Sequence, residues 1–285
     1  MTSIEWTEKT WNPVTGCTKI SPGCAHCYAA DLARRFWGNR QFSDIQFHED
    51  RLEQPLKRRK PTMWFVNSMS DLFHESIADE QLDQIFAVMA LTPQHIYQVL
   101  TKRPERMLKY LSDSWNADYP GYKTEYRVNG TADQIASKFG LTWENVASLP
   151  LPNVWLGVTA ENQSVADERI PLLLQTPASV RFLSCEPLLS SLRLDWKVDW
   201  VIIGGESGSK ARKFRLEWAI ALAEQCKAAD IPYFVKQMGS KPTYAGTAIA
   251  LEGKGTDLST LPSILQVREW PQAMEGRTLG ENSQS

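Results

Sequence analysis

The chain has 285 residues, of which 42% are apolar, so it can bury the core of one barrel-sized domain or of two smaller ones. We expect a single domain over residues 1–272 and a flexible tail over residues 273–285. The formal net charge of −2 gives no global evidence for nucleic acid as a partner. Apolar runs stay below the roughly 18 residues of a membrane span, and the polar start is unlike a signal peptide. The sequence therefore predicts a cytoplasmic protein without a membrane partner.

Three of the five cysteines lie close together near the start of the chain. Cys17, Cys24 and Cys27 form a C-x6-C-x2-C cluster, in which Pro22 and Gly23 predict a turn. An odd number of cysteines, three of them clustered, is unlike a disulfide framework and favours a metal site. A helix that starts near Cys24 is predicted by apolar residues at helical spacing, which are Ala29, Leu32, Ala33, Phe36 and Trp37.

Six short apolar runs further along the chain are typical of strands buried on both faces. They are Thr62–Val66, Ile96–Leu100, Val154–Val158, Val180–Leu183, Trp200–Ile203 and Tyr233–Val235. Stretches with helical spacing separate most of them. The signals for these helices are Asp79 as a cap, Pro104 in a first turn, a capping box of Ser164 and Asp167, and an apolar stripe from Leu216 to Cys226.

This alternation of strands and helices implies an α/β fold with a parallel sheet and helices outside it. The sheet is predicted to be a closed or partly open barrel, or a doubly wound sheet. Two segments do not fit the alternation. The polar stretch near residues 111–150 is predicted to be an insertion over one rim of the sheet, and the chain after Ser240 is predicted to wrap the outside.

Polar side chains follow nearly every predicted strand, at the end where both architectures place their ligands. These residues are Asn67, Ser68, Asp71, Thr101, Lys102, Arg103, Thr159, Glu161, Asn162, Ser184, Cys185, Glu186, Gly204, Gly205, Glu206, Ser207, Lys236 and Gln237. Loops after strands are often polar, so the pattern alone leaves open a binding site or ordinary loops.

Three thiols with no fourth nearby suit a metal centre that keeps an open position. Cysteine thiolates are the usual ligands of Fe–S clusters, and three of them on a [4Fe–4S] cube leave one iron free to coordinate a substrate or cofactor. The amino-terminal amides of the following helix would face the anionic sulfurs of such a cluster.

The segment Cys24-Ala-His-Cys-Tyr28, placed before the first helix, resembles the cluster loop of the radical S-adenosylmethionine (SAM) superfamily. The common spacing there is C-x3-C-x2-C, so the second interval matches and the first is longer. The whole chain resembles one branch, a phage- and prophage-associated three-Cys-motif family of poorly assigned function. The matching motifs are Thr10–Pro13, Asn67–His74, Asn153–Val158, Phe182–Leu188, Gly204–Gly208 and Phe234–Gln237.

The resemblance implies a partial (β/α)6-type TIM barrel and a [4Fe–4S] cluster held by the three clustered cysteines, with SAM on the fourth iron. One electron from an external donor would cleave SAM to methionine and a 5'-deoxyadenosyl radical, which abstracts a substrate hydrogen. The implied SAM contacts are His26 to the adenine, Ser68 and Asp71 to the methionine amino group, and Thr159 and Glu161 to the ribose. The candidates for substrate contact or proton transfer are Glu186, Glu206 and Lys236.

The resemblance leaves the substrate open. A nucleotide or nucleic acid is the candidate class, because phages often modify their DNA bases, and a protein partner is a further candidate. The alternative is a non-enzymatic zinc-binding or nucleic-acid-binding phage protein, with His26 or His74 completing a zinc site. Asp71 and His74 could equally cap the next helix, and Glu186 and Glu206 could be ion-paired residues of the rim.

Three further features carry weaker hypotheses. The basic run Lys57–Lys60 is either a solvated face or a nucleic-acid contact. Cys226 is expected in the core, whereas Cys185 is either part of the core or a second redox site. Trp11 and Trp115 are expected to be partly exposed, where they could stack on a planar substrate.

Overall fold

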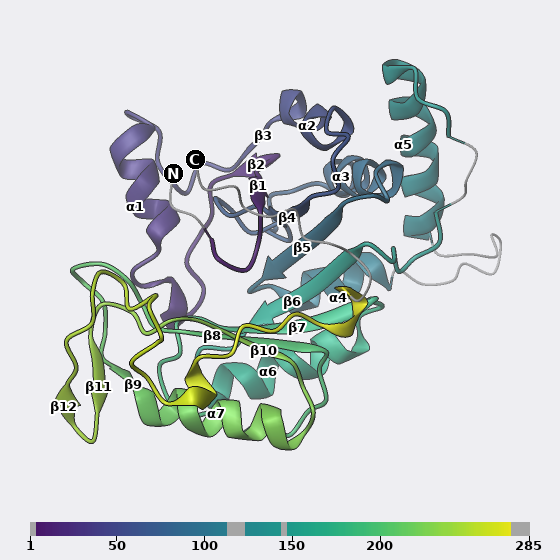
Figure 1. The fold of residues 1–285 in the computed structure, drawn as a ribbon. Coiled ribbons are helices and arrows are strands. Elements are labelled where there is room, and N and C mark those ends of the chain that lie inside the picture. The colour runs from purple at the N-terminus through teal and green to yellow at the C-terminus, as the bar shows by residue number, and fades with distance from the viewer. Residues whose placement is uncertain (1–3, 113–122, 144–146, 275–285) are drawn as a thin grey trace.

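The computed structural model describes residues 4–112, 123–143 and 147–274. Its centre is a seven-stranded sheet in which every pairing is parallel and which curls into a half-barrel (Figure 1). In sheet order the strands are β1 (Lys9–Trp11), β4 (Met63–Val66), β5 (Ile96–Thr101), β6 (Val154–Thr159), β7 (Val180–Cys185), β8 (Trp200–Gly204) and β10 (Tyr233–Gln237). The six predicted strands are all present, and β1 is an additional strand at one edge.

Helices cover the convex side of this sheet, as the alternation predicts (Figure 1). They are α3 (Asp79–Leu91), α4 (Pro104–Leu111), α6 (Gln163–Gln175) and α7 (Leu216–Ala228). The first three directly follow β4, β5 and β6, and α7 lies in the chain between β8 and β10. Residues 186–199 join β7 to β8 without a helix, and no helical pattern was predicted there. Within the described residues, no helix combines the length and the apolar character needed to cross a bilayer.

Shorter elements surround the half-barrel. They are β2 (Val14–Thr15) paired with β3 (Gln46–Phe47), the helices α1 (Tyr28–Phe36) and α2 (Glu53–Leu56), and the 3-10 turns η1 (Pro22–Cys24) and η2 (Glu49–Arg51). The C-terminal part adds β9 (Phe214–Arg215), β11 (Pro242–Tyr244), β12 (Thr247–Ala248), η3 (Ser263–Leu265) and η4 (Gln272–Met274). Beyond Ser240, where the sequence predicted a segment that wraps the outside, Arg268 makes an isolated bridge with Phe234 of the edge strand β10.

The predicted insertion is in part a helix, α5 (Lys123–Phe139), which packs against α3 on the outside of the molecule (Figure 1). It therefore extends the helical layer, whereas the sequence predicted a position over the rim of the sheet. Residues 113–122 and 144–146 of this segment, including Trp115, lie outside the described residues, as do residues 275–285 of the predicted tail.

The two faces of the sheet carry different cores because successive side chains of a strand point to opposite faces. On the convex face, Val201 and Ile203 belong to the large core that includes the helices. On the concave face, Trp200 and Ile202 belong to a separate aromatic core. Its other buried members are Trp6, Met63, Phe65, Ile96, Trp155, Val180, Phe182 and Phe234. These side chains close the half-barrel toward the amino ends of the strands.

Further along each strand the concave face becomes polar. Gly157 sits where a Cβ atom would lie 2.5 Å from the ring of Phe182, so only a glycine leaves room for that ring. The next concave positions are Thr159 on β6, and Glu186 and Lys236 at the ends of β7 and β10. The concave face is therefore apolar toward the amino ends of the strands and polar at their carboxyl ends.

Candidate functional site

The three clustered cysteines lie in the loop that follows β2, beside the carboxyl end of β4. Gly16 begins this loop with a φ of +99° and makes an isolated bridge with Ser70, just beyond β4. A Cβ atom at Gly16 would lie 2.4 Å from the carbonyl oxygen of Asp44, so the backbone path requires glycine there. The loop then forms the 3-10 turn η1 around Cys24, and Cys27 occupies the position before α1.

The helix after the cysteines begins later than predicted. It starts at Tyr28, because Pro22 and Gly23 form the separate turn η1, so the prediction of a start near Cys24 was wrong. Only Ala29 and Ala33 of the predicted apolar stripe are buried, and Phe36 is 76% exposed.

All three thiols are free and partly exposed. Among the described residues, no group of three His, Cys, Asp or Glu side chains is arranged to hold a metal ion. That arrangement requires donor atoms converging on one ion, whereas each cysteine of an Fe–S cube binds a different iron.

The thiols differ in acidity. Burial raises the pKa of Cys17 to about 12, and the nearby Asp71 carboxylate adds to this effect. Burial would also raise the pKa of Cys24, but the charge of Lys102 and hydrogen bonds from the loop backbone outweigh it, and this pKa lies below its usual value. Negative charge on either Cys24 or Cys27 raises the pKa of Cys17 further, so Cys17 lies within electrostatic range of both other thiols.

Two ion pairs from distant parts of the chain hold the turn between the cysteines. The backbone N–H of Gly23 donates to Glu161 Oε1 over 3.0 Å, and Arg169 from α6 lies 3.2 Å from the other oxygen of the same carboxylate. Glu161 is 0% exposed and Arg169 is 3% exposed, so this pair is fully buried. A Cβ atom on Gly23 would lie 2.9 Å from Glu161 Oε1, so the close approach depends on glycine.

The second ion pair holds the same turn from the side of β8. Arg212 donates to both carboxylate oxygens of Glu206 over 2.8 Å and 3.0 Å, and its other terminal nitrogen donates to the carbonyl of Pro22 over 3.0 Å. The Arg212 charge lowers the pKa of Glu206, although burial alone would raise it. Glu206 is thus an ion-paired rim residue that supports the cysteine loop through Arg212.

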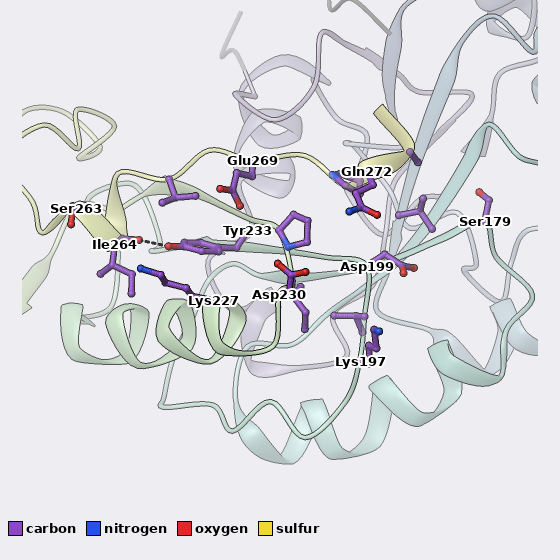
Figure 2. Close-up of a pocket in the computed structure, with 17 residues that line it drawn as sticks. Ser179, Lys197, Asp199, Lys227, Asp230, Tyr233, Ser263, Ile264, Glu269 and Gln272 are labelled. Carbon is purple, nitrogen blue, oxygen red and sulfur yellow. Dashed lines mark hydrogen bonds between the residues drawn. The ribbon is translucent and has the colours of Figure 1, made fainter. Parts of the chain in front are cut away.

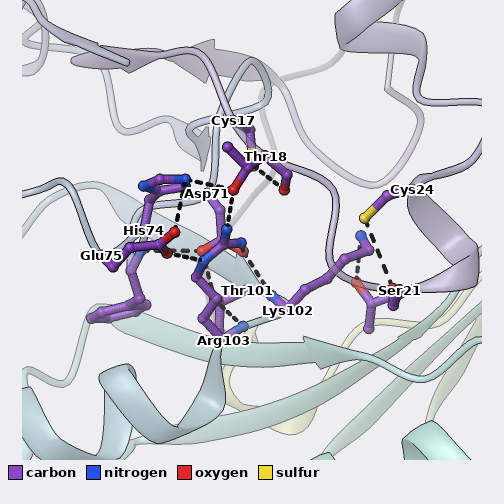
Figure 3. A network of polar contacts seen from close by, with 12 residues as sticks. Cys17, Thr18, Ser21, Cys24, Asp71, His74, Glu75, Thr101, Lys102 and Arg103 are labelled. Atoms are coloured by element: carbon purple, nitrogen blue, oxygen red, sulfur yellow. Dashed lines mark hydrogen bonds and ion pairs between the residues drawn. The ribbon is translucent and has the colours of Figure 1, made fainter. Parts of the chain in front are cut away.

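A third network lies around Asp71 (Figure 3). The carboxylate of this buried residue accepts hydrogen bonds from Thr101 Oγ1 over 2.6 Å and from the backbone N–H of Lys102 over 2.9 Å. Arg103 approaches it to 3.7 Å and donates to Glu75 over 2.8 Å. The side chain of Lys102 extends from this network toward the cysteine loop and donates to Thr159 Oγ1 over 3.2 Å (Figure 3).

His74 and Asp71, which were also considered as caps of the next helix, do not have that role. His74 is buried, its Nε2 lies 2.8 Å from Thr18 Oγ1, and its Nδ1 accepts the backbone N–H of Ser76. The helix α3 begins only at Asp79, and Asp71 accepts the N–H of Phe73 within a turn, so neither residue caps it.

Three further polar residues lie together at the ends of β7 and β10. Lys236 donates to Glu186 Oε1 over 2.6 Å, and Gln237 donates to the same oxygen over 3.2 Å. Both side chains of the ion pair are less than one-fifth exposed. Two of the three residues predicted for substrate contact, Glu186 and Lys236, are therefore in direct contact with each other.

The chain was compared with known proteins. A family model described as a protein of unknown function, DUF5131, matches residues 1–283. The chain belongs to the DUF5131 family. No curated protein and no solved structure matches it.

In this DUF5131 member, the remaining predicted contacts lie around the cysteine loop. Ser68 donates through its hydroxyl to Asn12 over 3.2 Å, and its carbonyl accepts the Tyr28 hydroxyl over 2.7 Å. Thr159 is fully buried. His26 is half-buried, and as a charged imidazole it contributes to the lowered pKa of Glu206.

Two arginines of the site in this DUF5131 member could not be predicted, whereas Lys102, Arg103 and Lys236 were predicted from their places at strand ends. Arg169 and Arg212 were not singled out, although each binds a carboxylate that was. An arginine four or more residues beyond a strand-end carboxylate is common in any chain, so the sequence carried no signal that would have selected these two.

The structure also places a tryptophan, a helix cap and two further cysteines that the sequence singled out. Trp11 is 0% exposed and its Nε1–H donates to the carbonyl of Arg51, so it offers no stacking surface. The helix α6 is capped by Asn162, which accepts the N–H of Val165, and Ser164 lies inside the helix. The two remaining cysteines, Cys185 and Cys226, are both 0% exposed; this confirms the core assignment of Cys226 and favours the same for Cys185.

A cavity of about 650 Å³ lies elsewhere in this DUF5131 member (Figure 2). It is at the amino ends of β7, β8 and β10, beneath the C-terminal segment. Tyr233 spans it and donates to the carbonyl of Ile264 over 2.9 Å. Its ionisable residues are Lys197, Asp199, Lys227, Asp230, Tyr233 and Glu269, and the cysteines are at the opposite end of the sheet. It is therefore separate from the candidate site.

Proposed function

We propose that the protein is a radical SAM enzyme whose Cys17, Cys24 and Cys27 hold a [4Fe–4S] cluster. One observation carries the proposal: a loop with three free thiols is fastened over the carboxyl ends of a curled parallel sheet, where ligands bind in such folds. The half-barrel is then a partial (β/α)6-type TIM barrel with a seventh strand.

The donor set fits such a cluster. Three thiols and no fourth in the same loop leave one iron open, and when bound the cluster supplies the electron that cleaves SAM to a hydrogen-abstracting radical. Cys17 holds its proton at neutral pH in the ligand-free chain, so cluster assembly releases a proton there. Lys102 places a positive charge near Cys24, which favours the thiolate.

The other residues of the loop and rim have positioning roles in this proposal. Glu161 and Arg212 hold the turn at Gly23 and Pro22, so the second and third thiols keep a defined distance from the sheet. Asp71 orders the segment that begins at Thr101, because its oxygens accept both the hydroxyl of that residue and the next backbone N–H. The contacts of His26, Ser68, Asp71, Thr159 and Glu161 with SAM stay predictions.

The pair of Glu186 and Lys236 is the candidate for handling a proton of the substrate. A lysine that donates to a carboxylate over 2.6 Å on a polar concave surface can hold a proton at that oxygen and pass it on. The substrate class proposed is a nucleotide or nucleic acid, with DNA-base modification as the reaction. The proposal also requires an external electron donor and a cytoplasmic location, and it allows a protein partner.

Anaerobic reconstitution tests the proposal. The purified chain should take up about four irons and four sulfides, and 5'-deoxyadenosine should form after SAM and dithionite are added. Changing Cys17, Cys24 or Cys27 to Ala should abolish both. The matched control is Cys226→Ala, which removes a thiol from the core and should leave iron uptake intact.

Stoichiometric zinc with no iron uptake would instead support the non-enzymatic zinc-binding alternative. Equal loss of iron in the Cys226→Ala control would show that the three-cysteine ligand set is wrong. Circular dichroism of each variant separates the loss of a ligand from a loss of folding.

A further inference from the structure

A second basic site lies at the other end of the sheet from the cysteines. It is a pocket of about 440 Å³ at the amino ends of β1 and β4. Its lining residues are Lys9, Gln54, Lys57, Arg58, Arg59, Lys60 and Trp64. Lys9 and Trp64 are paired residues of neighbouring strands, and the basic run Lys57–Lys60 connects α2 to β4. The pocket therefore brings together cations that are far apart in the sequence.

The charge of this pocket is not neutralised from within. Five of its seven lining residues are cationic and none is acidic. Lys57 has an ion pair with Glu53 on the exposed surface of α2. For the other four cations, the described residues include no carboxylate within ion-pair distance, and Lys9, Arg59 and Lys60 are exposed. A pocket of this composition has a positive potential that attracts anions.

One wall of the pocket is the side chain of Trp64, which is 5% exposed. Its indole nitrogen is closed off from solvent, so the exposed cations, and not the indole N–H, provide the contacts for a ligand.

We propose that this pocket binds phosphate groups of a nucleic-acid backbone. Its volume exceeds what one phosphate needs, and its cations come from two segments, which suits successive phosphates of a strand. Because Trp64 is nearly fully buried, its ring offers no face for a base to stack on, so the contact is to the backbone and independent of sequence.

An anionic membrane surface is the other large polyanion, and the structure favours it less. Membrane-surface binding usually combines cations with apolar side chains that insert among the lipids. The exposed large apolar residues of the described chain are Ile20, Tyr28, Phe36, Tyr126, Leu141 and Tyr244, and none of them lines the pocket.

The site stands apart from the proposed chemistry. A nucleic acid bound here would contact the end of the sheet opposite the cysteine loop. Only the further statement that this nucleic acid is also the substrate rests on the proposed function. Binding itself requires no cluster, so it is measured on the full-length chain purified in air without added iron. A failure of binding and a failure of iron uptake are thereby distinguished.

The test is the salt dependence of binding to a fluorescein-labelled single strand of roughly 20 nucleotides, followed by anisotropy from about 50 to about 200 mM KCl. The double variant Arg59→Ala/Lys60→Ala removes two exposed cations of the pocket. We expect its slope of log affinity against log salt to be smaller by roughly 1.4. Its affinity near 100 mM should fall by on the order of tenfold or more.

The matched control is Lys109→Ala/Lys227→Ala, which removes two exposed cations from α4 and α7. It lowers the net charge by the same amount and should leave the slope unchanged. Trp64→Phe keeps a ring in the wall of the pocket but removes the N–H, and it should leave both the affinity and the slope unchanged, because the contacts come from the exposed cations. Urea unfolding of the Trp64 variant confirms that the core is intact.

Equal losses in the pocket variant and the control would overturn the proposal, because binding would then follow net charge alone. So would a pocket variant that keeps its DNA affinity but loses binding to phosphatidylserine vesicles, since the site would then be a membrane contact.

Discussion

Charged side chains are arranged differently at the two ends of the sheet. Around the cysteine loop they form ion pairs, the buried pair of Glu161 with Arg169 and the partly exposed pair of Glu206 with Arg212. At the amino ends of β1 and β4, cations such as Arg59 and Lys60 are exposed without an acidic partner among the described residues. Buried pairs fix geometry at a cost in desolvation, whereas exposed cations leave the structure unaffected and attract a partner. This difference is what the two proposals require, a preorganised site at the first end and an electrostatic contact at the second.

The strongest test of this difference is Arg169→Met, which leaves the carboxylate of Glu161 buried without its ion-pair partner. The free energy of unfolding should fall by about 3 to 5 kcal/mol. The double variant Glu161→Gln/Arg169→Met removes the unpaired charge and should recover part of the loss. Urea unfolding measures both, and a loss below about 1 kcal/mol would show that the pair does not hold the loop.

The next effect is expected for Asp71→Asn. The amide loses one acceptor oxygen, so one of the donors at Thr101 and Lys102 is left unsatisfied in a buried place. We expect the free energy of unfolding to fall by about 2 kcal/mol. Asp50→Asn, at an exposed position, is the control and should be near neutral. If the two variants lose the same stability, the Asp71 network is not a rigid part of the rim.

A pH-dependent effect is expected for Arg212→Met. The pKa of Glu206 is lowered in the folded chain, so the pair stabilises the protein above the ordinary carboxyl value of 4.5 and loses this contribution as the pH falls through the lowered pKa. The variant should be less stable by about 1 to 2 kcal/mol at neutral pH. The difference from the wild type should shrink below pH 4.5, as unfolding curves at several pH values would show. A constant difference would mean that Glu206 is not the partner that matters.

The smallest effect is expected at the amino ends. Arg59→Ala removes an exposed charge with no ion pair among the described contacts, so the free energy of unfolding should change by less than about 0.5 kcal/mol. A large loss of stability in thermal or urea unfolding would show that this run is structural, and the contrast between the two ends would no longer hold.

The strands could be predicted because parallel strands buried on both faces read as continuous apolar runs. The edge strand β1 was missed since its three residues include two that are exposed, and it is a strand because of its pairing with β4. The same pairing carries Trp11 into the core beside Tyr97, with ring centroids 5.6 Å apart. Its burial therefore depends on a neighbour that is distant in the sequence.

The candidate site was predictable in its thiols and in the carboxylates at the strand ends. The residue that caps α6 was not predicted correctly. Asn162 and Ser164 are both residue types that cap helices, and only the extended backbone of Asn162 and its bond from the N–H of Val165 show which of them does so. Which groups neutralise the carboxylates was also beyond the reach of sequence patterns. Local patterns give residue type and periodicity, but they do not give the partner of a charge.

Apolar periodicity and cysteine spacing, both local properties, established the alternating elements and the thiol cluster. The tertiary structure alone decided that Arg212 reaches the carbonyl of Pro22, 190 residues away, and that Lys9 lies beside the run Lys57–Lys60. The physical reason is that an ion pair or a shared pocket depends on distances in space. Those distances are set when the sheet curls and brings the ends of separate strands together.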